Sequence, residues 1–283
     1  MTGPLLWLQA MLAHEFIRDA FLAGTGVALA SGLSGYFLVL RNQVFAADAL
    51  SHVAFTGALA ALAFGLSEIG GLLAATLFVA VILSVLTTGT RSGDVVIGAV
   101  FAWILGLGVL FLSIYVSGRS GGAGANGTAG VNVLFGSIFG VSPSQALLGA
   151  GLGAGVAAGM VAIARPLLFA SLDGDAAMAS GVPVRWLGLV FLMLVAVVAA
   201  QAVQVVGAML MLGLMATPAA IAQRLTMRPY AGMLLSAAAA IAAVWVGITL
   251  SFAVPHLPPS FAVIGLLFGA YVALAGAAAL RRT

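Results

Sequence analysis

The segment from residue 41 to residue 57 reads Arg41-Asn-Gln-Val-Phe-Ala-Ala-Asp48-Ala-Leu-Ser51-His52-Val-Ala-Phe-Thr56-Gly57. It opens a long apolar run, yet it carries a carboxylate and an imidazole four residues apart. On an α-helix, positions i and i+4 share one face, with their Cβ atoms roughly 5–6 Å apart. Ser51 stands beside this pair, and Thr56 extends the same stripe by one turn. A charged side chain inside a membrane helix costs from about 2.5 to more than 10 kcal/mol, so such a residue indicates a functional site by default.

The spacing alone leaves two interpretations of Asp48 and His52 open. A carboxylate oxygen and an imidazole nitrogen suit a borderline divalent metal ion such as zinc or manganese. Alternatively, Asp48 caps the helix near the membrane surface and His52 forms a hydrogen bond with a neighbouring helix. Asp-x-x-x-His is a short and common pattern, so spacing does not decide between them.

The composition places the chain in a membrane. Its 283 residues are 63% hydrophobic and only 6% charged, with a mean hydropathy of +1.24. Soluble domains of this length do not have such a composition, so we predict an all-α, polytopic bundle forming one transmembrane domain over residues 1–283. Cysteine is absent, which excludes disulfides and thiolate metal sites. The net charge of +3 informs topology and does not indicate nucleic-acid binding.

A membrane span needs about 20 apolar residues. Nine segments qualify, or eight if the sixth and seventh form one bent span: Ala20–Leu40, Ala46–Leu66, Gly70–Thr88, Val95–Val116, Gln145–Ala164, Trp186–Ala202, Val205–Ala222, Tyr230–Phe252 and Phe261–Leu280. With nine spans and the 165–185 loop inside, only Arg18 and Arg119 of the ten arginines fall outside. This bias supports nine spans, an outer N-terminus and an inner C-terminus.

Two segments outside the spans are apolar. Residues 1–19 predict a short interfacial helix leading into the first span. Val131–Pro143 is too short to cross and too apolar to be solvated, which fits a re-entrant or interfacial segment buried against protein. The glycine-rich Ser117–Gly130 before it lacks the Gly-Lys-Ser/Thr of a phosphate loop, so we reject an ATP site there.

Gly151, Gly155 and Gly159 repeat at four-residue intervals in the fifth span. Small residues at this spacing let helix backbones approach closely. We expect these glycines to serve helix packing, either within one subunit or across a dimer.

The 165–185 loop is the largest polar feature, and we expect it on the cytoplasmic side. Ser171 or Asp173 can cap a short helix, Gly181 suits its C-terminal end and Pro183 prevents continuation. The simplest interpretation is a connector between spans.

Several motifs together give the chain a family resemblance. Arg41–Gly57, with Asp48-Ala-Leu-Ser51-His52 at its centre, resembles the metal-type ABC transporter permeases, the membrane subunits of bacterial zinc and manganese uptake systems. Ala47 replaces the family's usual Gly, and Asn42 replaces a frequent second Arg. Further similarities are Leu134-Phe-Gly-Ser-Ile-Phe-Gly-Val-Ser142, Asp173-x-x-x-Ala177-x-x-x-Gly181-Val-Pro-Val, Gln204-Val-Val-Gly207 and Thr217-Pro-Ala-Ala220.

The resemblance implies a set of partners. The 165–185 loop would contain the coupling helix that docks on a separate dimer of ABC ATPase subunits in the cytoplasm, with Leu172, Asp173, Asp175, Ala177 and Gly181 as its characteristic residues. Leu172 stands where the family usually has Phe. An extracytoplasmic binding protein would deliver the ion, and the chain would lie in the bacterial inner membrane.

Two ligands are too few for a tight site, because zinc generally takes four and manganese about six. A second copy across a two-fold axis would supply another Asp48–His52 pair. Water or Ser51 would complete the shell in the alternative case. Gln204, Glu68 and His256 are further possible ligands, although Gln204 is of a type that more often forms hydrogen bonds between helices. His256 lies in an outer loop where the chain departs from the family's Asp-x-Pro-x-Gly.

We therefore expect a homodimeric, ATP-driven importer subunit that carries zinc or manganese, holds no permanent cofactor and is not itself an enzyme. An ion-gradient-driven secondary transporter, with Asp48 and His52 as a proton or metal relay, is the alternative. An intramembrane enzyme is a third class, but no Ser–His or His-Glu-x-x-His arrangement supports it.

Overall fold

The computed structural model describes residues 11, 13–87, 93–118, 136–254 and 256–280. Helices dominate these residues, as expected where no water is available to satisfy backbone N–H and C=O groups. The elements in chain order are α2 (Glu15–Leu40), α3 (Val44–Ala63), α4 (Glu68–Thr87), α5 (Gly93–Gly118), the 3-10 turn η1 (Ile138–Gly140), α7 (Pro143–Leu172), α8 (Gly174–Ala179), α9 (Val184–Val205), α10 (Ala208–Leu225), α11 (Pro229–Ala253) and α12 (Pro259–Leu280).

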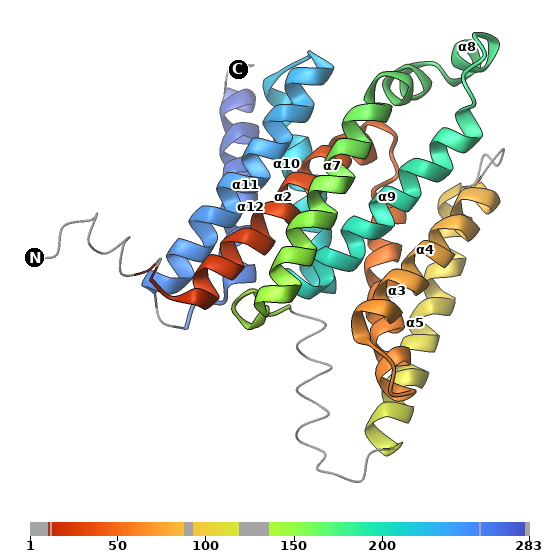
Figure 1. Cartoon of the computed structure of the whole chain (residues 1–283). Coiled ribbons are helices and arrows are strands. Elements are labelled where there is room, and N and C mark those ends of the chain that lie inside the picture. Colours follow the sequence, from red (N-terminus) through yellow and green to blue (C-terminus); the bar gives the residue numbers. More distant parts are fainter. Residues whose placement is uncertain (1–10, 12, 88–92, 119–135, 255, 281–283) are drawn as a thin grey trace, which may run out of the picture.

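Eight helices of the described chain are long and apolar enough to cross a membrane, and α10 contributes a shorter apolar helix over Leu210–Leu225. A break separates α9 from α10 at Gly207, whose φ of 97° suits glycine. The 18 residues of α10 would extend about 27 Å, close to the hydrocarbon thickness. Figure 1 shows α9 and α10 running in opposite directions, which agrees with two separate crossings and with the nine-span topology.

The helices form two groups joined by α9. α2 lies at the centre of one group and packs against α7, α10 and α11, while α3 packs against α4 and α5 in the other. α9 contacts members of both groups, and Figure 1 shows it between them. The pair Asp48–His52 therefore belongs to the group of α3, α4 and α5.

Glycines of α2 set its distance from the neighbouring helices. The backbones of Gly26 and Gly153 meet at the crossing with α7, and Gly32 lies against Ala237 of α11. Gly151 and Gly155 have open space where a Cβ would stand, so they make no close approach within the described chain. Gly159 approaches only the side chain of Leu194. The close approach to α2 is therefore made by Gly153, outside the four-residue repeat.

Two boundaries differ from the sequence-based expectation. Glu15–Asp19 form the first turns of α2 and not a separate interfacial helix, because nothing interrupts the helix before Ala20; residues 1–10 and 12 lie outside the described residues. α7 continues through Arg165 and Pro166 to Leu172. Its 30 residues extend about 45 Å, so its end projects beyond a hydrocarbon core of about 30 Å.

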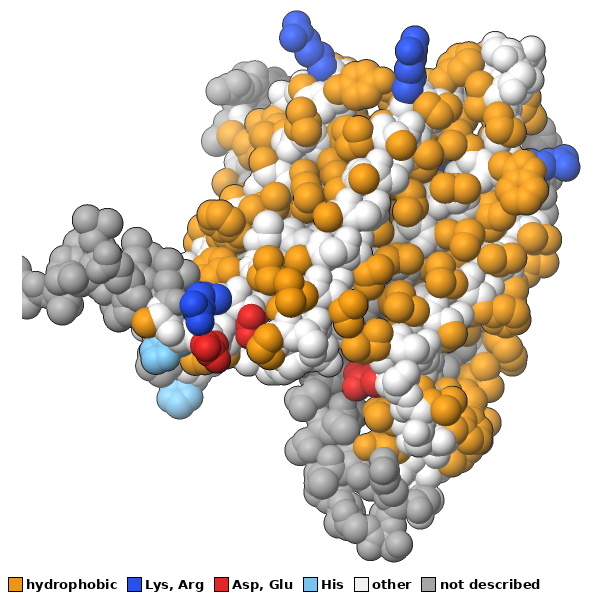
Figure 2. Space-filling view, viewed as in Figure 1, with side chains coloured by type: hydrophobic (Ala, Val, Ile, Leu, Met, Phe, Trp, Pro, Cys, Tyr) orange, Lys and Arg blue, Asp and Glu red, His pale blue; other side chains and the backbone are white. Residues whose placement is uncertain are grey.

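Positive charge concentrates at one end of the molecule, here named the Arg-rich end. Arg41, Arg165, Arg185, Arg224 and Arg228 belong to it, while Arg18 lies at the opposite end beside Glu15. Figure 2 shows blue side chains at the upper end, and a blue group with red and pale blue neighbours at the lower end. The positive-inside rule assigns the Arg-rich end to the cytoplasm.

Candidate functional site

The start of α3 positions Asp48 and His52. The helix begins at Val44 after a turn in which Asn42 adopts a φ of 53°. Asp48 lies in the second turn, so it is not the N-terminal cap, a position held by Gln43. Its carboxylate forms no hydrogen bond or ion pair with the described residues, and both Asp48 and His52 are half-buried. The carboxylate thus lies near the Arg-rich end of α3 without a hydrogen-bond or ion-pair partner among the described residues.

The imidazole of His52 packs against one aromatic ring. Its centroid lies 5.0 Å from that of Phe101 on α5, with an angle of 68° between the ring planes. This edge contact fixes the ring without using its nitrogens, and we find no hydrogen bond from His52 to another helix in the described chain. The spacing suggests two structural roles, a helix cap for Asp48 and an interhelical hydrogen bond for His52. Within the described residues, neither side chain has that role.

The neighbouring hydroxyl groups of Ser51 and Thr56 already donate hydrogen bonds to backbone carbonyls. Ser51 is fully buried, and its Oγ donates to the carbonyl oxygen of Asp48 at 2.7 Å. Thr56 Oγ1 donates to the carbonyl oxygen of Ile104 at 3.2 Å. The described residues contain no cluster of three or more His, Cys, Asp or Glu that could hold a metal ion. One chain therefore offers two charged or imidazole ligands at this position.

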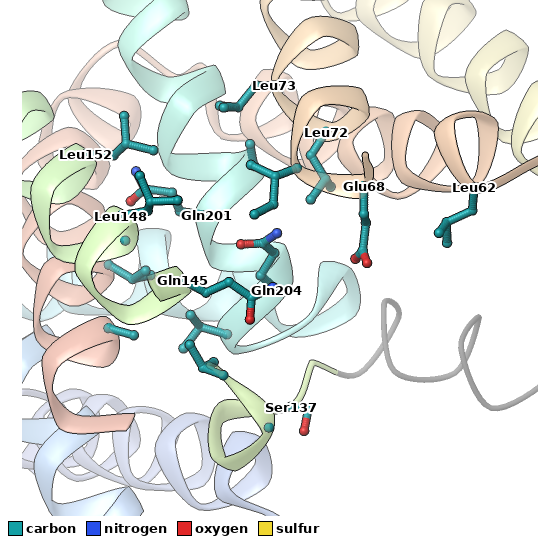
Figure 3. Close-up of a pocket in the computed structure, with 18 of the residues that line it drawn as sticks. Leu62, Glu68, Leu72, Leu73, Ser137, Gln145, Leu148, Leu152, Gln201 and Gln204 are labelled. Carbon is teal, nitrogen blue, oxygen red and sulfur yellow. The ribbon is translucent and has the colours of Figure 1, made fainter. Parts of the chain in front are cut away.

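The other predicted ligands lie elsewhere. Glu68 and Gln204 line a cavity of about 550 Å³ at the end opposite the Arg-rich end. Figure 3 shows their side chains around this cavity together with Gln145 and Gln201. His256 is exposed in the link between α11 and α12, at the same end of the molecule. The structure thus brings Asp48, Ser51 and His52 together and separates them from Glu68, Gln204 and His256.

Arg41 connects the start of α3 to the end of α7. Its Nη1 donates to Ser171 Oγ at 3.3 Å, its Nε donates to Gln43 Oε1 at 3.2 Å, and its guanidinium lies 5.7 Å from the ring centroid of Phe191. Burial lowers the pKa of Arg41 from its usual value, although a guanidinium stays protonated. The sequence motif includes Arg41 but does not reveal this contact, because Ser171 is 130 residues away.

A short helix, α8, lies in the loop where the family resemblance implies a coupling helix. Asp173 caps it, with Oδ1 accepting from the N–H of Ala176 at 2.9 Å, and Ser171 instead donates to the carbonyl of Leu167. Gly181 ends the turn with a φ of 82°. Ala177 is buried, whereas Leu172 and Met178 are 68% and 53% exposed. Figure 1 shows α8 standing away from the bundle at the Arg-rich end.

The end opposite the Arg-rich end contains part of the predicted re-entrant segment. Val131–Phe135 lies outside the described residues, but Gly136–Val141 contains the 3-10 turn η1, in which Ile138 is buried. Gly136 has a φ of 72° and lies against the backbone of Val206 and Gly207, and Ser137 N donates to the carbonyl of Gln204 at 3.3 Å. Ser142 and Gln145 then form a capping box that starts α7. This short non-α segment thus packs against the α9–α10 break through Gly136 and Ser137.

Known proteins similar to this chain include membrane proteins of manganese transport. The manganese transport system membrane protein MntC of Halalkalibacterium halodurans is 27% identical over 229 residues, which cover 81% of this chain and 76% of MntC. The manganese import system permease protein ScaB of Streptococcus parasanguinis is 26% identical over 253 residues, which cover 88% of this chain and 87% of ScaB.

A solved structure shares the fold. PsaBC from Streptococcus pneumoniae, solved in complex with a Fab, superposes with a TM-score of 0.81 at 22% identity, covering 94% of this chain and 93% of the other. Residues 13–277 match the ABC 3 transport family, and the chain belongs to that family.

Proposed function

We propose that this chain is the membrane-spanning subunit of an ATP-driven importer for divalent transition-metal ions in the bacterial cytoplasmic membrane. Family membership and the helical bundle support a transport subunit. Relatives named for manganese transport favour manganese over zinc as the cargo. The observation that carries the proposal is the half-buried Asp48–His52 pair, which has no protein hydrogen-bond partner among the described residues and is held one helical turn apart on α3.

A homodimer completes the proposed site. Each chain contributes one carboxylate and one imidazole, so a two-fold axis beside α3 brings two of each to one ion. Both side chains are only half-buried, which leaves them accessible to a second copy. Four such ligands, with water added for manganese, give a shell that releases its ion more readily than a closed structural site.

The energy source is a separate ATPase. The sequence contains no lysine, so the chain has no Walker A lysine with which to bind nucleotide phosphates. α8, with its exposed Leu172 and Met178, is the proposed docking element for this partner. An extracytoplasmic binding protein delivers the ion to the opposite end, and alternating access is a change in tilt between the two transmembrane subunits.

Uptake by proteoliposomes tests the proposal. The chain is reconstituted with the ATPase and binding protein encoded beside it, and accumulation of manganese and of zinc is measured with and without ATP. We expect ATP-dependent manganese uptake by the wild type. We expect at least about a tenfold loss of uptake in Asp48→Ala and in His52→Ala, because replacing even a residue that only supports a metal ligand typically costs 10–100-fold.

His14→Ala and Asp19→Ala provide matched controls, since they change the same residue types at the opposite end of the molecule. Both should transport as the wild type does. Normal uptake by His52→Ala would remove the metal-site claim. Uptake that proceeds without the ATPase would replace the proposal with an ion-gradient-driven transporter in which Asp48 and His52 form a relay.

A further inference from the structure

The cavity at the end opposite the Arg-rich end is lined in part by polar side chains. Asp48 and His52 are not among its lining residues. It has a volume of about 550 Å³ and lies where α3 and α9 end and α4 and α7 begin. Its polar groups come from six side chains: Glu68, Gln145, Gln201, Gln204, Ser137 and Tyr115. Figure 3 shows Gln145, Gln204 and Glu68 around this space, with Gln201 beside Leu148 and Leu152 on its other side.

Gln201 has an amide without a protein partner. The residue is only 5% exposed, and neither its Nε2 nor its Oε1 forms a hydrogen bond within the described part of the chain. Buried polar groups in native proteins nearly always have partners, so an orphaned amide that borders a cavity points to a ligand or ordered water inside it. The sequence shows Gln201 as a polar residue in an apolar run, but it does not show that the amide borders a cavity.

Among the described residues that line the cavity, Glu68 alone carries a carboxylate. It is half-buried at the first residue of α4. Among the described residues Glu68 has no ion-pair partner. The cavity thus combines one carboxylate with neutral amide and hydroxyl groups. Such groups attract a cation, but they leave the water molecules bound to it in place.

The size of the cavity agrees with a cation that keeps its water. Six waters occupy roughly 180 Å³ at about 30 Å³ each, which fits within this space. Amide and carboxylate oxygens accept hydrogen bonds from such waters, as they do around cations that dehydrate reluctantly. The described residues that line the cavity include no His or Cys that could replace the water shell of a transition metal.

We propose that this cavity binds a hydrated divalent cation, with Glu68 and Gln201 as the groups that contact its water shell. The proposal deepens the proposed function: Leu62 of α3 borders the cavity ten residues beyond His52, about 15 Å along the helix. The cavity is therefore a second binding site, separate from the Asp48–His52 pair and nearer the outer side. In this proposal, ions lose their water only at the Asp48–His52 pair.

Electron paramagnetic resonance of Mn²⁺ tests the site in the full complex with its ATPase, in lipid nanodiscs. The double variant Asp48→Ala/His52→Ala removes the inner ligands. We expect this variant to retain one Mn²⁺ per chain, with proton couplings of bound water and no nitrogen coupling. Mg²⁺ should displace it, since a hydrated site discriminates little between such ions.

Adding Glu68→Gln to the double variant should weaken Mn²⁺ binding at least tenfold, whereas adding Glu15→Gln, an exposed acid at the same end, should leave it unchanged. Gln201→Leu should weaken binding at least threefold without lowering the melting temperature, because it removes an orphaned amide. Absence of bound Mn²⁺ in the double variant, or binding that survives Glu68→Gln, would overturn the proposal. Either result leaves the uptake test of Asp48 and His52 intact, so the two proposals fail separately.

Discussion

Individual residues were predictable where their chemistry conflicts with the environment. An Asp and a His inside an apolar run require an explanation, and their helical spacing is local, so the sequence could place them on one face of α3. Contacts between distant segments were not predictable. Arg41 lies 130 residues from Ser171, and the amide of Gln201 is unusual only because the folded neighbours leave it without a partner.

Close helix contacts make Gly32 sensitive to substitution. A Cβ at this position would lie 2.5 Å from Ala237 Cα, and Ser236 Oγ donates to the Gly32 carbonyl at 2.7 Å. We expect Gly32→Ala to destabilise the protein by about 1–3 kcal/mol, the usual cost of overpacking. The apparent melting temperature of the purified chain in detergent measures this.

Gly98→Ala on α5 is the matched control, because no atom lies within 4 Å of a Cβ there. It should leave the melting temperature unchanged or raise it slightly, since alanine favours helix. Equal melting temperatures of Gly32→Ala and Gly98→Ala would show that the α2–α11 contact does not limit stability.

At the scale of elements, apolar runs located the long helices and the capping signals located α8. Helix ends were less predictable, because α7 runs eight residues past its apolar segment, through Pro166. Pro166 cannot donate to the carbonyl of Ala162, which lies on an exposed face of α7.

The cap of α8 yields a test of the coupling role. Asp173→Ala removes the acceptor for Ala176 N–H, which should cost about 0.5–2 kcal/mol of helix stability, whereas Asp173→Asn preserves a capping oxygen. We expect Asp173→Ala to lower ATP-dependent uptake severalfold without changing metal affinity, and Asp173→Asn to retain uptake. Uptake and manganese binding are measured on the same reconstituted complex.

The two variants separate capping from charge. If Asp173→Asn loses uptake as Asp173→Ala does, the carboxylate contacts the ATPase directly and the cap is secondary. If both variants transport normally, the proposed coupling role of α8 is contradicted.

At the scale of the whole molecule, composition and arginine placement predicted a helical membrane bundle and its orientation. The arrangement of the helices was not predictable, because α2 and α9 hold the bundle together through contacts between segments far apart in the sequence. Nor does a single chain reveal the second copy that the proposed metal site needs.

The absence of cysteine permits a clean test of the nine-crossing topology. Met227 is 95% exposed between α10 and α11, and Leu66 is 67% exposed between α3 and α4. With a membrane-impermeant maleimide on intact spheroplasts, Leu66→Cys should be labelled, whereas Met227→Cys and Ser180→Cys should react only after permeabilisation. Labelling of Met227→Cys in intact spheroplasts would mean that α10 does not cross. The wild type, without cysteine, sets the background.

The most direct test of the central claim is the ligand set of the bound ion. Pulsed electron paramagnetic resonance of Mn²⁺ in the assembled complex detects nitrogen within the first coordination shell. We predict coupling to two imidazole nitrogens, one from His52 of each chain, and its complete loss in His52→Gln. A wild-type complex in which none of the bound Mn²⁺ shows nitrogen coupling, or unchanged coupling in His52→Gln, would contradict the assignment of the Asp48–His52 pair as the transport site.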